Sequence, residues 1–446
     1  MININFKTEK NGISQSSHEE IYTLLQISSG EKRRDKARSP LNIAIALDRS
    51  GSMHGRPLNE AKLCIEMMID RLSAEDHFSL VAYDNDVDVV VPATKASNKE
   101  WLKARVKSIR SGGMTALYDG WSSAAAEAAK NVTKQSVSRV LLLSDGQANE
   151  GLTDQDEIAS HCNQMASVGV STTTYGLSEN FNENLMSAMA KSGKGMAHYG
   201  QTADDLADPF QSEFDLIDAL TARDLKLHLI AEPNVEFEVM NKFQRNLDGS
   251  FVMSDLAEGG ELWALLKIKV SKSSLSGVKD GKLRILSAFL DYKNMNGDNC
   301  RTEQSHLILD LVSDTVFASL ETEELVSLRK VELEAANLQD AARVAARRHD
   351  WNEVNDLVAQ LDVLGVENEW VKESTKKLRE YADRRETERF SKEAFYKSDR
   401  MRTRMGVMNE EASYHPEAEA KYVPSFLRRK VEFGKKSQVD RRNPRT

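Results

Sequence analysis

The sequence of 446 residues predicts an α/β fold, with a doubly wound and mostly parallel sheet, followed by an antiparallel β-sandwich and a C-terminal α-helical region. Three patterns predict this order. Between residues 37 and 220, short apolar runs alternate with helical periodicity, which favours a parallel sheet covered by helices on both faces. Between 221 and 315, apolar and polar residues alternate as they do in antiparallel strands. Between 316 and 405, the periodicity is helical.

Two apolar runs in the first region indicate strands buried on both faces, 41–47 (LNIAIAL) and 139–143 (RVLLL). Further strands are expected at 77–83, 87–91, 167–176 and 196–199, of which 87–91 is a short antiparallel edge. Helices are expected between them at 57–72, 101–109, 118–130, 156–165 and 183–191, with a closing helix over 203–220.

Three short segments carry oxygen-bearing side chains near the ends of these strands. They are Asp48-Arg49-Ser50-Gly51-Ser52, Gly112-Gly113-Met114-Thr115 and Ser144-Asp145-Gly146. The first follows one buried strand and the third follows the other. Ligand sites in open α/β sheets form at the carboxyl ends of strands, where loops from neighbouring strands converge. We therefore expect the three segments to meet at one point.

The chemistry of these segments favours a hard divalent cation. Carboxylates and hydroxyls make an all-oxygen set, which suits Mg²⁺ or Mn²⁺ and disfavours zinc or copper. Ser50 and Ser52 are two residues apart, so one tight turn can direct both hydroxyls at one ion. Gly51 and Gly112-Gly113 are expected to supply conformational freedom to their turns. Neutral hydroxyls leave the ion much of its charge, so an anionic ligand from outside is expected.

At these residues the chain resembles the von Willebrand factor A (VWA) domain, a Rossmann-like fold whose metal-ion-dependent adhesion site (MIDAS) combines Asp-x-Ser-x-Ser, a loop Thr and a later Asp. The resemblance implies five ligands for Mg²⁺, Mn²⁺ or Ca²⁺, namely Asp48, Ser50, Ser52, Thr115 and Asp145. It also implies that ligand exchange at the ion slides the closing helix. The order of regions resembles bacterial intracellular proteins that join this domain to a trailing β-sandwich and helical region. The alternative is a set of polar turns that bind no ion.

The composition predicts a protein of the reducing cytoplasm. No apolar run approaches the roughly 18–20 residues that a membrane span needs, and the amino terminus has no stretch suited to a secretory signal. The three cysteines, Cys64, Cys162 and Cys300, are widely spaced and fit neither a disulfide framework nor a metal knuckle.

The regions that flank the predicted α/β domain have their own patterns. In the sandwich, strands are expected at 225–230, 235–239, 249–252, 262–270 and 283–292. A further strand at 21–27 has no partner in the α/β domain, so residues 1–36 are expected to pair with the sandwich and the domain 37–220 is then an insertion. In the helical region, 316–405, two helices joined at 347–350 should form an antiparallel hairpin. The charge-dense segment 372–404 favours an exposed helix or a partner-binding arm.

The last segment, 406–446, is expected to be a flexible basic tail, because residues 424–446 carry eight Lys or Arg against two acidic residues. A basic tail on a chain of net charge −9 can bind nucleic acid, an anionic surface or the chain itself. Because Phe426 and Phe433 are the only aromatic residues among these basic ones, and no zinc motif accompanies them, nucleic-acid binding through the tail is expected to be weak.

Together these features predict a non-enzymatic adhesion or scaffold module whose Mg²⁺ captures an Asp or Glu carboxylate of a partner protein. An AAA+ ATPase or a protein of a multi-protein stress system is the partner class expected. The alternative is a metal-dependent phosphohydrolase, because Asp48 at a strand end resembles the nucleophile of haloacid-dehalogenase-type phosphatases. Those enzymes need a second carboxylate two residues later, where this chain has Ser50.

Overall fold

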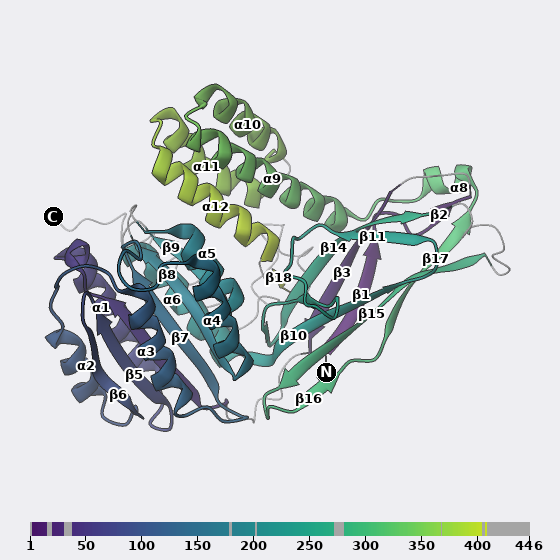
Figure 1. The fold of residues 1–446 in the computed structure, drawn as a ribbon. Helices are drawn as coiled ribbons and strands as arrows, with labels where there is room; N and C mark the ends of the chain where they lie inside the picture. Colours follow the sequence, from purple (N-terminus) through teal and green to yellow (C-terminus); the bar gives the residue numbers. More distant parts are fainter. Residues whose placement is uncertain are drawn as a thin grey trace, which may run out of the picture. The chain divides into compact units, whose positions relative to one another are not determined.

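The computed structural model describes residues 2–15, 20–30, 38–177, 181–200, 203–271, 281–366, 368–403 and 406–407. The chain divides into two compact units (Figure 1). One is the α/β unit, Lys36–Asp218. The other is the sandwich–helix unit, which combines Met1–Asp35 with Ala219–Thr446.

The sheet of the α/β unit has the strand order β6-β5-β4-β7-β8-β9. All neighbouring strands are parallel except β6, which pairs antiparallel with β5. From β4 the chain moves outward to β5 and β6, then returns to β7 and moves outward in the opposite direction. The order of the strands therefore reverses between β4 and β7, which confirms the doubly wound sheet. The bounds are β4 Leu41–Asp48, β5 His77–Tyr83, β6 Val87–Lys95, β7 Val137–Ser144, β8 Val170–Leu177 and β9 Lys194–Gly200.

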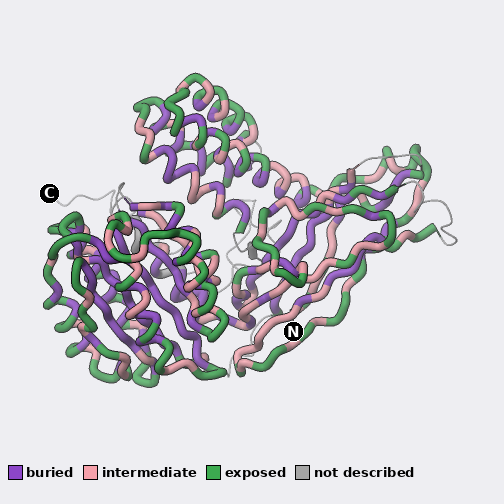
Figure 2. The backbone as a smooth tube through the Cα atoms, in the orientation of Figure 1, coloured by how far each residue is buried: buried purple, intermediate pink, exposed green. Residues whose placement is uncertain are grey.

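Helices connect these strands and cover the sheet, since right-handed crossovers that run outward in opposite directions place their helices on opposite faces. Every residue of β4 and β7 is buried, as Figure 2 shows along both strands. The bounds are α1 Arg56–Arg71, α2 Lys99–Ser108, α3 Leu117–Ala129, α4 Gln155–Ser167, α5 Glu183–Ser192 and α6 Ala203–Asp218.

Two predicted boundaries in this unit are wrong. The strand predicted from 167 begins at Val170, because α4 continues to Ser167 and Gly169 turns the chain with a φ of 98°. The closing helix α6 ends at Asp218, and the next residue but one, Leu220, begins a strand of the other unit.

A buried ion pair fastens α6 to the sheet. Arg139 on β7 and Glu213 on α6 form a salt bridge while only 2% and 0% exposed. Thr173 donates a hydrogen bond of 3.0 Å to the same Glu213 carboxylate. Burial by itself would raise the pKa of Glu213, but the charge of Arg139 and the neighbouring His198 lower it to about 2. This charge pair therefore holds the closing helix to the sheet together with buried apolar residues of the same helix, such as Phe210 and Phe214.

A second ionic cluster joins the two ends of the α/β unit. Arg38, at the entrance to the unit, donates to Asp76 at 2.9 Å and lies 3.2 Å from Asp218 at the exit. The Asp76 carboxylate is fully buried and also accepts the Leu41 backbone N–H at 2.8 Å. Arg71 on α1 reaches α6 as well, with its guanidinium 3.2 Å from Asp218. The chain thus enters and leaves this unit at one point.

Two sheets form the sandwich, and their facing apolar residues make one core. In the first sheet β3, which contains the segment 21–27, pairs antiparallel with β1 and β14, and β11 lies beyond β14. The strand predicted at 249–252 is shorter, because only Phe251–Val252 pair as β12. The first sheet contains β1 Ile2–Thr8, β3 Ile21–Ser29, β14 Gly260–Val270, β11 Val235–Val239 and β18 Gly406–Val407. The second contains β12, β10 Leu220–Ala231, β13 Leu256–Ala257, β15 Lys282–Asn294, β16 Asn299–Arg301, β17 Ser305–Val312 and β2 Ile13–Ser14.

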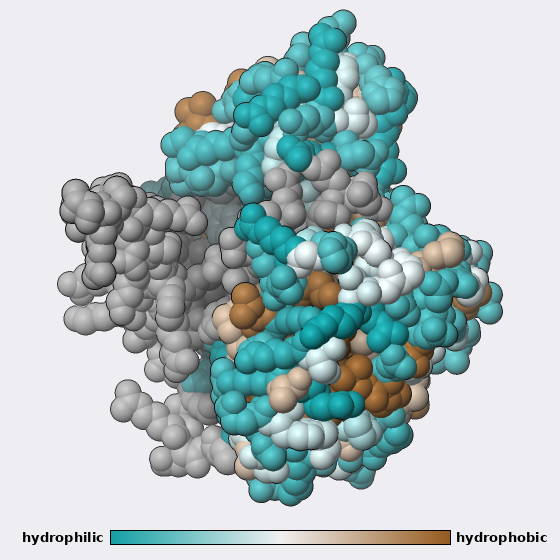
Figure 3. Space-filling model, turned by 90° about the vertical axis from the view of Figure 1, so that its left-hand side faces the viewer, coloured by the Kyte–Doolittle hydropathy of each residue, from teal (hydrophilic) through white to brown (hydrophobic). Residues whose placement is uncertain are grey.

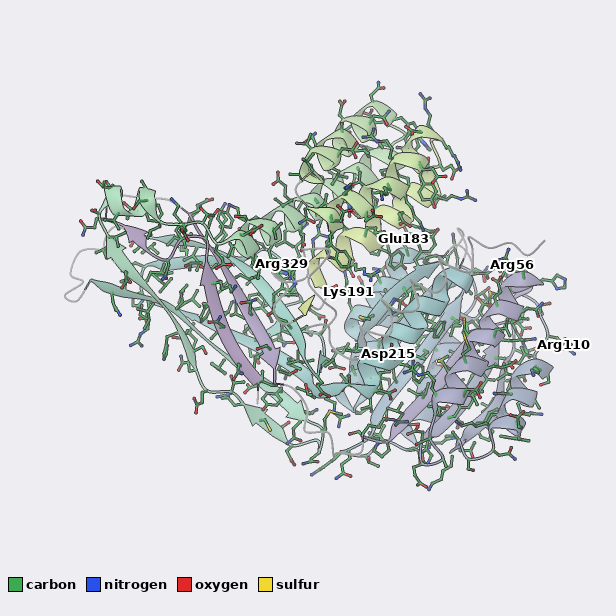
Figure 4. The ribbon with its side chains drawn as sticks, turned by 180° about the vertical axis from the view of Figure 1, so that it is seen from behind. Arg56, Arg110, Glu183, Lys191, Asp215 and Arg329 are labelled. Atoms are coloured by element: carbon green, nitrogen blue, oxygen red, sulfur yellow. The ribbon has the colours of Figure 1, made fainter. Side chains whose placement is uncertain are left out.

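Helices follow the sandwich and pack on it. Apolar residues of α9 cover the outer face of β3 and β14, where Arg329 of α9 (Figure 4) is fully buried. Its guanidinium lies 4.5 Å from the ring centroid of Trp263 and donates to Glu332 at 2.9 Å. The bounds are α8 Asp314–Ser319, α9 Glu324–Arg347, α10 Trp351–Leu364, α11 Glu369–Asp383 and α12 Thr387–Thr403.

The prediction of an exposed helix or arm over 372–404 is wrong. This segment forms most of α11 and all of α12, and Leu378, Phe390 and Met401 are buried in a core shared with α9 and α10. The few apolar residues lie on the inner faces, while the charged majority covers the outer surface. Apart from β18, the predicted basic tail lies outside the described residues. Among the helices that the structure describes, none has the length and apolar character needed to cross a membrane.

Replacing Glu213 with Gln should lower the free energy of unfolding of the α/β unit by about 3–5 kcal/mol, because the buried Arg139 would lose the charge of Glu213. Hydrogen exchange of the β7 amides at increasing urea concentration measures this loss. The double replacement Arg139→Met with Glu213→Leu removes both charges and should recover most of it. Wild-type stability of the single variant would contradict the role of the pair.

The same pair predicts a pH dependence. Because the pKa of Glu213 is about 2 in the folded chain against its usual value of 4.5, its charge stabilises the fold fully above the unfolded pKa. That stabilisation is lost as the pH falls from about 4.5 toward 2. The difference in the free energy of unfolding between the wild type and Glu213→Gln should therefore shrink below about pH 5. A difference that grows on acidification would contradict this assignment.

Candidate metal centre

The first loop of the site leaves β4 at Asp48, which is fully buried. The backbone N–H of Ser50 donates to Asp48 Oδ1 at 2.8 Å, so the carboxylate closes a tight turn over its own loop. The hydroxyls of Ser50 and Ser52 lie 3.1 Å apart. A short 3-10 turn, Gly51–Met53, then leads toward α1 and anchors the loop through the buried Met53. Both serine hydroxyls are thus held together beside the end of β4.

The third loop leaves β7 and meets the first directly. Ser144 donates its hydroxyl to Asp48 Oδ2 at 2.6 Å, and Ser52 donates to Asp145 Oδ1 at 2.7 Å. Two hydrogen bonds therefore join the carboxyl ends of β4 and β7, at the point where the strand order reverses. Asp145 is 2% exposed, so both predicted carboxylates are buried at the same edge of the sheet.

Thr115 approaches this point from the second loop. A Cβ added to Gly146 would lie 3.0 Å from Thr115 Oγ1 and 3.5 Å from Asp48 Oδ2, so hydroxyl and carboxylate border the same space. The Thr115 side chain is 4% exposed. The structure therefore brings together all five residues that the sequence singled out, and of these only Ser52 is exposed.

The electrostatics of the site favour a cation. Burial raises the pKa of Asp48 to about 6, against the hydrogen bonds from Ser144 and Ser50, and the charge of Asp145 acts in the same direction as burial. Burial also raises the pKa of Asp145, which Ser52 opposes. Two neighbouring buried carboxylates are costly without a counter-charge, and hydroxyls complete an all-oxygen donor set. The residues present fit a hard divalent cation.

The site does not resemble a metal site built from several charged or sulfur ligands. Among the described residues, no group of three or more His, Cys, Asp or Glu is arranged to hold a metal ion. An ion at the carboxyl ends of β4 and β7 would depend on hydroxyls for part of its coordination. Neutral oxygen ligands of this kind leave an ion able to attract an anion.

The structure corrects one physical reason given for the glycines. Neither Gly51, Gly112 nor Gly113 has a positive φ, so left-handed backbone is not what these positions require. Instead, a Cβ on Gly112 would lie 1.7 Å from Asp84 Oδ2, and a Cβ on Gly113 would lie 1.7 Å from Asn85 Oδ1. Close approach of the loop to a neighbouring turn requires these two glycines.

The same contacts identify residues that the sequence analysis missed. Asp84 and Asn85 form the turn between β5 and β6, beside the strand that carries Asp48. A signal was available, because a polar Asp-Asn pair follows the predicted strand 77–83 at the same edge of the sheet. Ser144 was part of the third segment, but its hydrogen bond to Asp48 was not predicted. Cys64 and Cys162 are buried and take no part in the site.

The rim around the site carries polar and basic side chains. His54 Nδ1 lies 2.9 Å from Ser111 Oγ, which links the first and second loops on the outside. Arg56 and Arg110 lie along the same outer edge of the α/β unit in Figure 4, and Met114 is 50% exposed. Viewed from the side of α1 and α2, the surface is largely hydrophilic with separate hydrophobic patches (Figure 3). This surface suits a polar or charged ligand group.

Comparison with known proteins agrees with this architecture. The family model of the von Willebrand factor type A domain matches residues 42–212. The uncharacterized protein sll0103 of Synechocystis sp. is 27% identical over 221 residues, which are 48% of this chain and 51% of that protein. The chain therefore spans about half the length of this curated relative.

Two solved structures resemble the chain over most of its length. The von Willebrand factor type A protein from Catenulispora acidiphila has a TM-score of 0.67 at 16% identity, covering 84% of this chain and 89% of that one. The ArnB paralog VWA2 from Sulfolobus acidocaldarius has a TM-score of 0.59 at 16% identity, covering 91% and 100%. The likeness in fold thus extends beyond residues 42–212.

Replacing Gly120 with Ala should destabilise the α/β unit by about 1–3 kcal/mol, because overpacking forces buried groups apart. The new Cβ would lie 2.2 Å from the ring of Tyr83, where α3 presses on β5. Thermal unfolding followed by circular dichroism measures the effect. Ser123→Ala on the same helix is the control and should leave the midpoint nearly unchanged. Equal midpoints for the two variants would contradict the close approach.

Proposed function

Because residues 42–212 form a von Willebrand factor type A domain, we propose that this unit binds one divalent cation and uses it to capture a carboxylate of a partner protein. Mg²⁺ is the ion we propose, with Mn²⁺ and Ca²⁺ as substitutes. The ligands in this proposal are Asp48, Ser50, Ser52, Thr115 and Asp145. Its main support is the convergence of these five side chains around the ends of β4 and β7.

The proposed set leaves room for a ligand from outside. Mg²⁺ takes six oxygen ligands in near-octahedral geometry, so five side chains leave one position for another oxygen. Three of the five are neutral hydroxyls, and the ion therefore keeps part of its charge. An Asp or Glu carboxylate on a partner supplies both the oxygen and the negative charge. The exposed Ser52 marks the side from which such a group would approach.

In this proposal the protein's own residues hold and orient the ion, and they do not carry out a reaction. Ser144 holds the second oxygen of Asp48, and Ser52 holds Asp145, so both carboxylates are oriented before an ion arrives. The phosphohydrolase alternative needs a paired carboxylate two residues after the nucleophile. Ser50 occupies that position, and no feature of the described site favours turnover over binding.

Removing one carboxylate should strongly weaken metal binding at the proposed site. We expect wild-type protein to bind one Mn²⁺, and Asp48→Asn to weaken this binding by about 100-fold or more, since even residues behind a metal ligand contribute 10–100-fold. Electron paramagnetic resonance of free Mn²⁺ during titration measures the affinity. Asp119→Asn, an exposed acid on α3, is the control and should bind as the wild type does. Equal affinities for all three proteins would refute the proposed site.

Capture of a partner should depend on the same ion. Protein immobilised in Mg²⁺ should retain a partner that EDTA releases, and Thr115→Val should lose it while keeping the fold. The measurement is affinity purification with and without Mg²⁺, read by mass spectrometry. A partner that is retained equally in EDTA and by Thr115→Val would show that capture does not use the ion.

A further inference from the structure

The second loop of the site is held by hydrogen bonds from its successive backbone N–H groups. It has no regular secondary structure between α2 and α3, yet each of its successive backbone N–H groups from 112 to 116 donates to a residue outside the loop. The acceptors are Arg49 O for Gly112 at 2.7 Å, Asp84 Oδ2 for Gly113 at 3.3 Å, Asn85 Oδ1 for Met114 at 2.7 Å, Asn149 Oδ1 for Thr115 at 3.2 Å and Asp84 O for Ala116 at 2.9 Å. Three of these five acceptors belong to the turn between β5 and β6.

Asp84 is the centre of this arrangement. Its carboxylate accepts the Asp86 backbone N–H at 3.0 Å and the Arg49 guanidinium at 3.2 Å through Oδ1, and Gly113 through Oδ2. The residue is 7% exposed. Burial would raise the pKa of Asp84, but these hydrogen bonds and the charge of Arg49 lower it. Both oxygens are engaged by donors, so Asp84 is placed to hold the loop and not to bind an ion.

Asn85 ties the second loop to the third. Its amide oxygen accepts the Met114 N–H, while its amide nitrogen donates to Glu150 at 2.7 Å. The first loop joins as well, because the Gly51 N–H donates to Gly113 O at 2.8 Å. The turn thus contacts a loop that itself contacts both carboxylate-bearing loops.

The glycines show how close this contact is. Any side chain at Gly112 or Gly113 would overlap the Asp84 carboxylate or the Asn85 amide, at 1.7 Å in each case. A contact this close restricts movement of the loop. It fixes the backbone of Met114 and Thr115 relative to β5, a strand paired directly with β4.

From these contacts we infer that Asp84 and Asn85 are positioning residues, a brace that sets the Thr115 hydroxyl in place before the ion binds. This inference rests on the proposed function for the role of Thr115. It goes further because it makes the affinity for the ion depend on two residues outside the proposed set of ligands. It also makes the second loop a fixed part of the site, so that ion binding requires no rearrangement of that loop.

The test is a double-mutant cycle on Mn²⁺ affinity, with Asn85→Ala and Thr115→Val made singly and together. If Asn85 acts by placing Thr115, Asn85→Ala should weaken Mn²⁺ binding about 10- to 100-fold in the wild type and less than about threefold in the Thr115→Val background. Hydrogen exchange without metal should show faster exchange at 112–116 in Asn85→Ala and unchanged exchange in β4 and β7. Asp86→Ala, in the same turn, is the control and should match the wild type in both measurements.

A rescue variant separates the brace from general damage. Asn85→Asp with Glu150→Gln reverses the hydrogen bond between these residues and keeps an acceptor for the Met114 N–H, so it should restore Mn²⁺ affinity to within about threefold of the wild type. Full affinity in Asn85→Ala, or losses that simply add in the cycle, would overturn the inference. If the wild type binds no Mn²⁺, the proposed function fails, and unchanged exchange at 112–116 in Asn85→Ala would then overturn the brace separately.

Discussion

The parallel pairing of β4 with β7 is the constraint on which the candidate site depends. Its register sets Leu47 beside Leu143, so the next residues, Asp48 and Ser144, emerge together and hydrogen-bond. A slip of one residue would turn every side chain of the shifted strand to the other face of the sheet. The loops would then carry the same residues to different places. The burial of apolar residues on both faces of β4 and β7 therefore determines where the polar side chains at the ends of these strands lie.

Much of this could be predicted from sequence, because the signals are local. Short apolar runs predict β4 and β7, and the residues after them predict the carboxylates. What escaped prediction depends on distant partners. Arg139 and Glu213 are 74 residues apart, and nothing near either one distinguishes a buried charge from a surface charge. The prediction of an exposed helix over the segment of α11 and α12 was wrong for the same reason. Its few apolar residues form a core only together with α9 and α10, which lie outside that segment.

The glycines of the second loop show how a correct residue can be given the wrong reason. Sequence suggests conformational freedom, which is the commonest use of glycine in a turn. The structure shows contact with Asp84 and Asn85 where a Cβ has no room. The two explanations predict different behaviour. If the glycines supplied conformational freedom, the loop could change shape. The close contacts instead hold the loop in one shape, between the first loop, the turn from β5 to β6 and the third loop.

The ionic cluster of Arg38, Asp76 and Asp218 has a consequence for how the whole chain folds. In the sandwich β3 pairs with β14, although the whole α/β unit lies between these strands in the sequence. A flexible connection of that length would cost loop-closure entropy, which grows with the logarithm of the number of residues. Because the folded unit enters and leaves at one place, it behaves as a short connection. Early folding of the insertion thus lowers the entropy that the surrounding strands lose when they assemble.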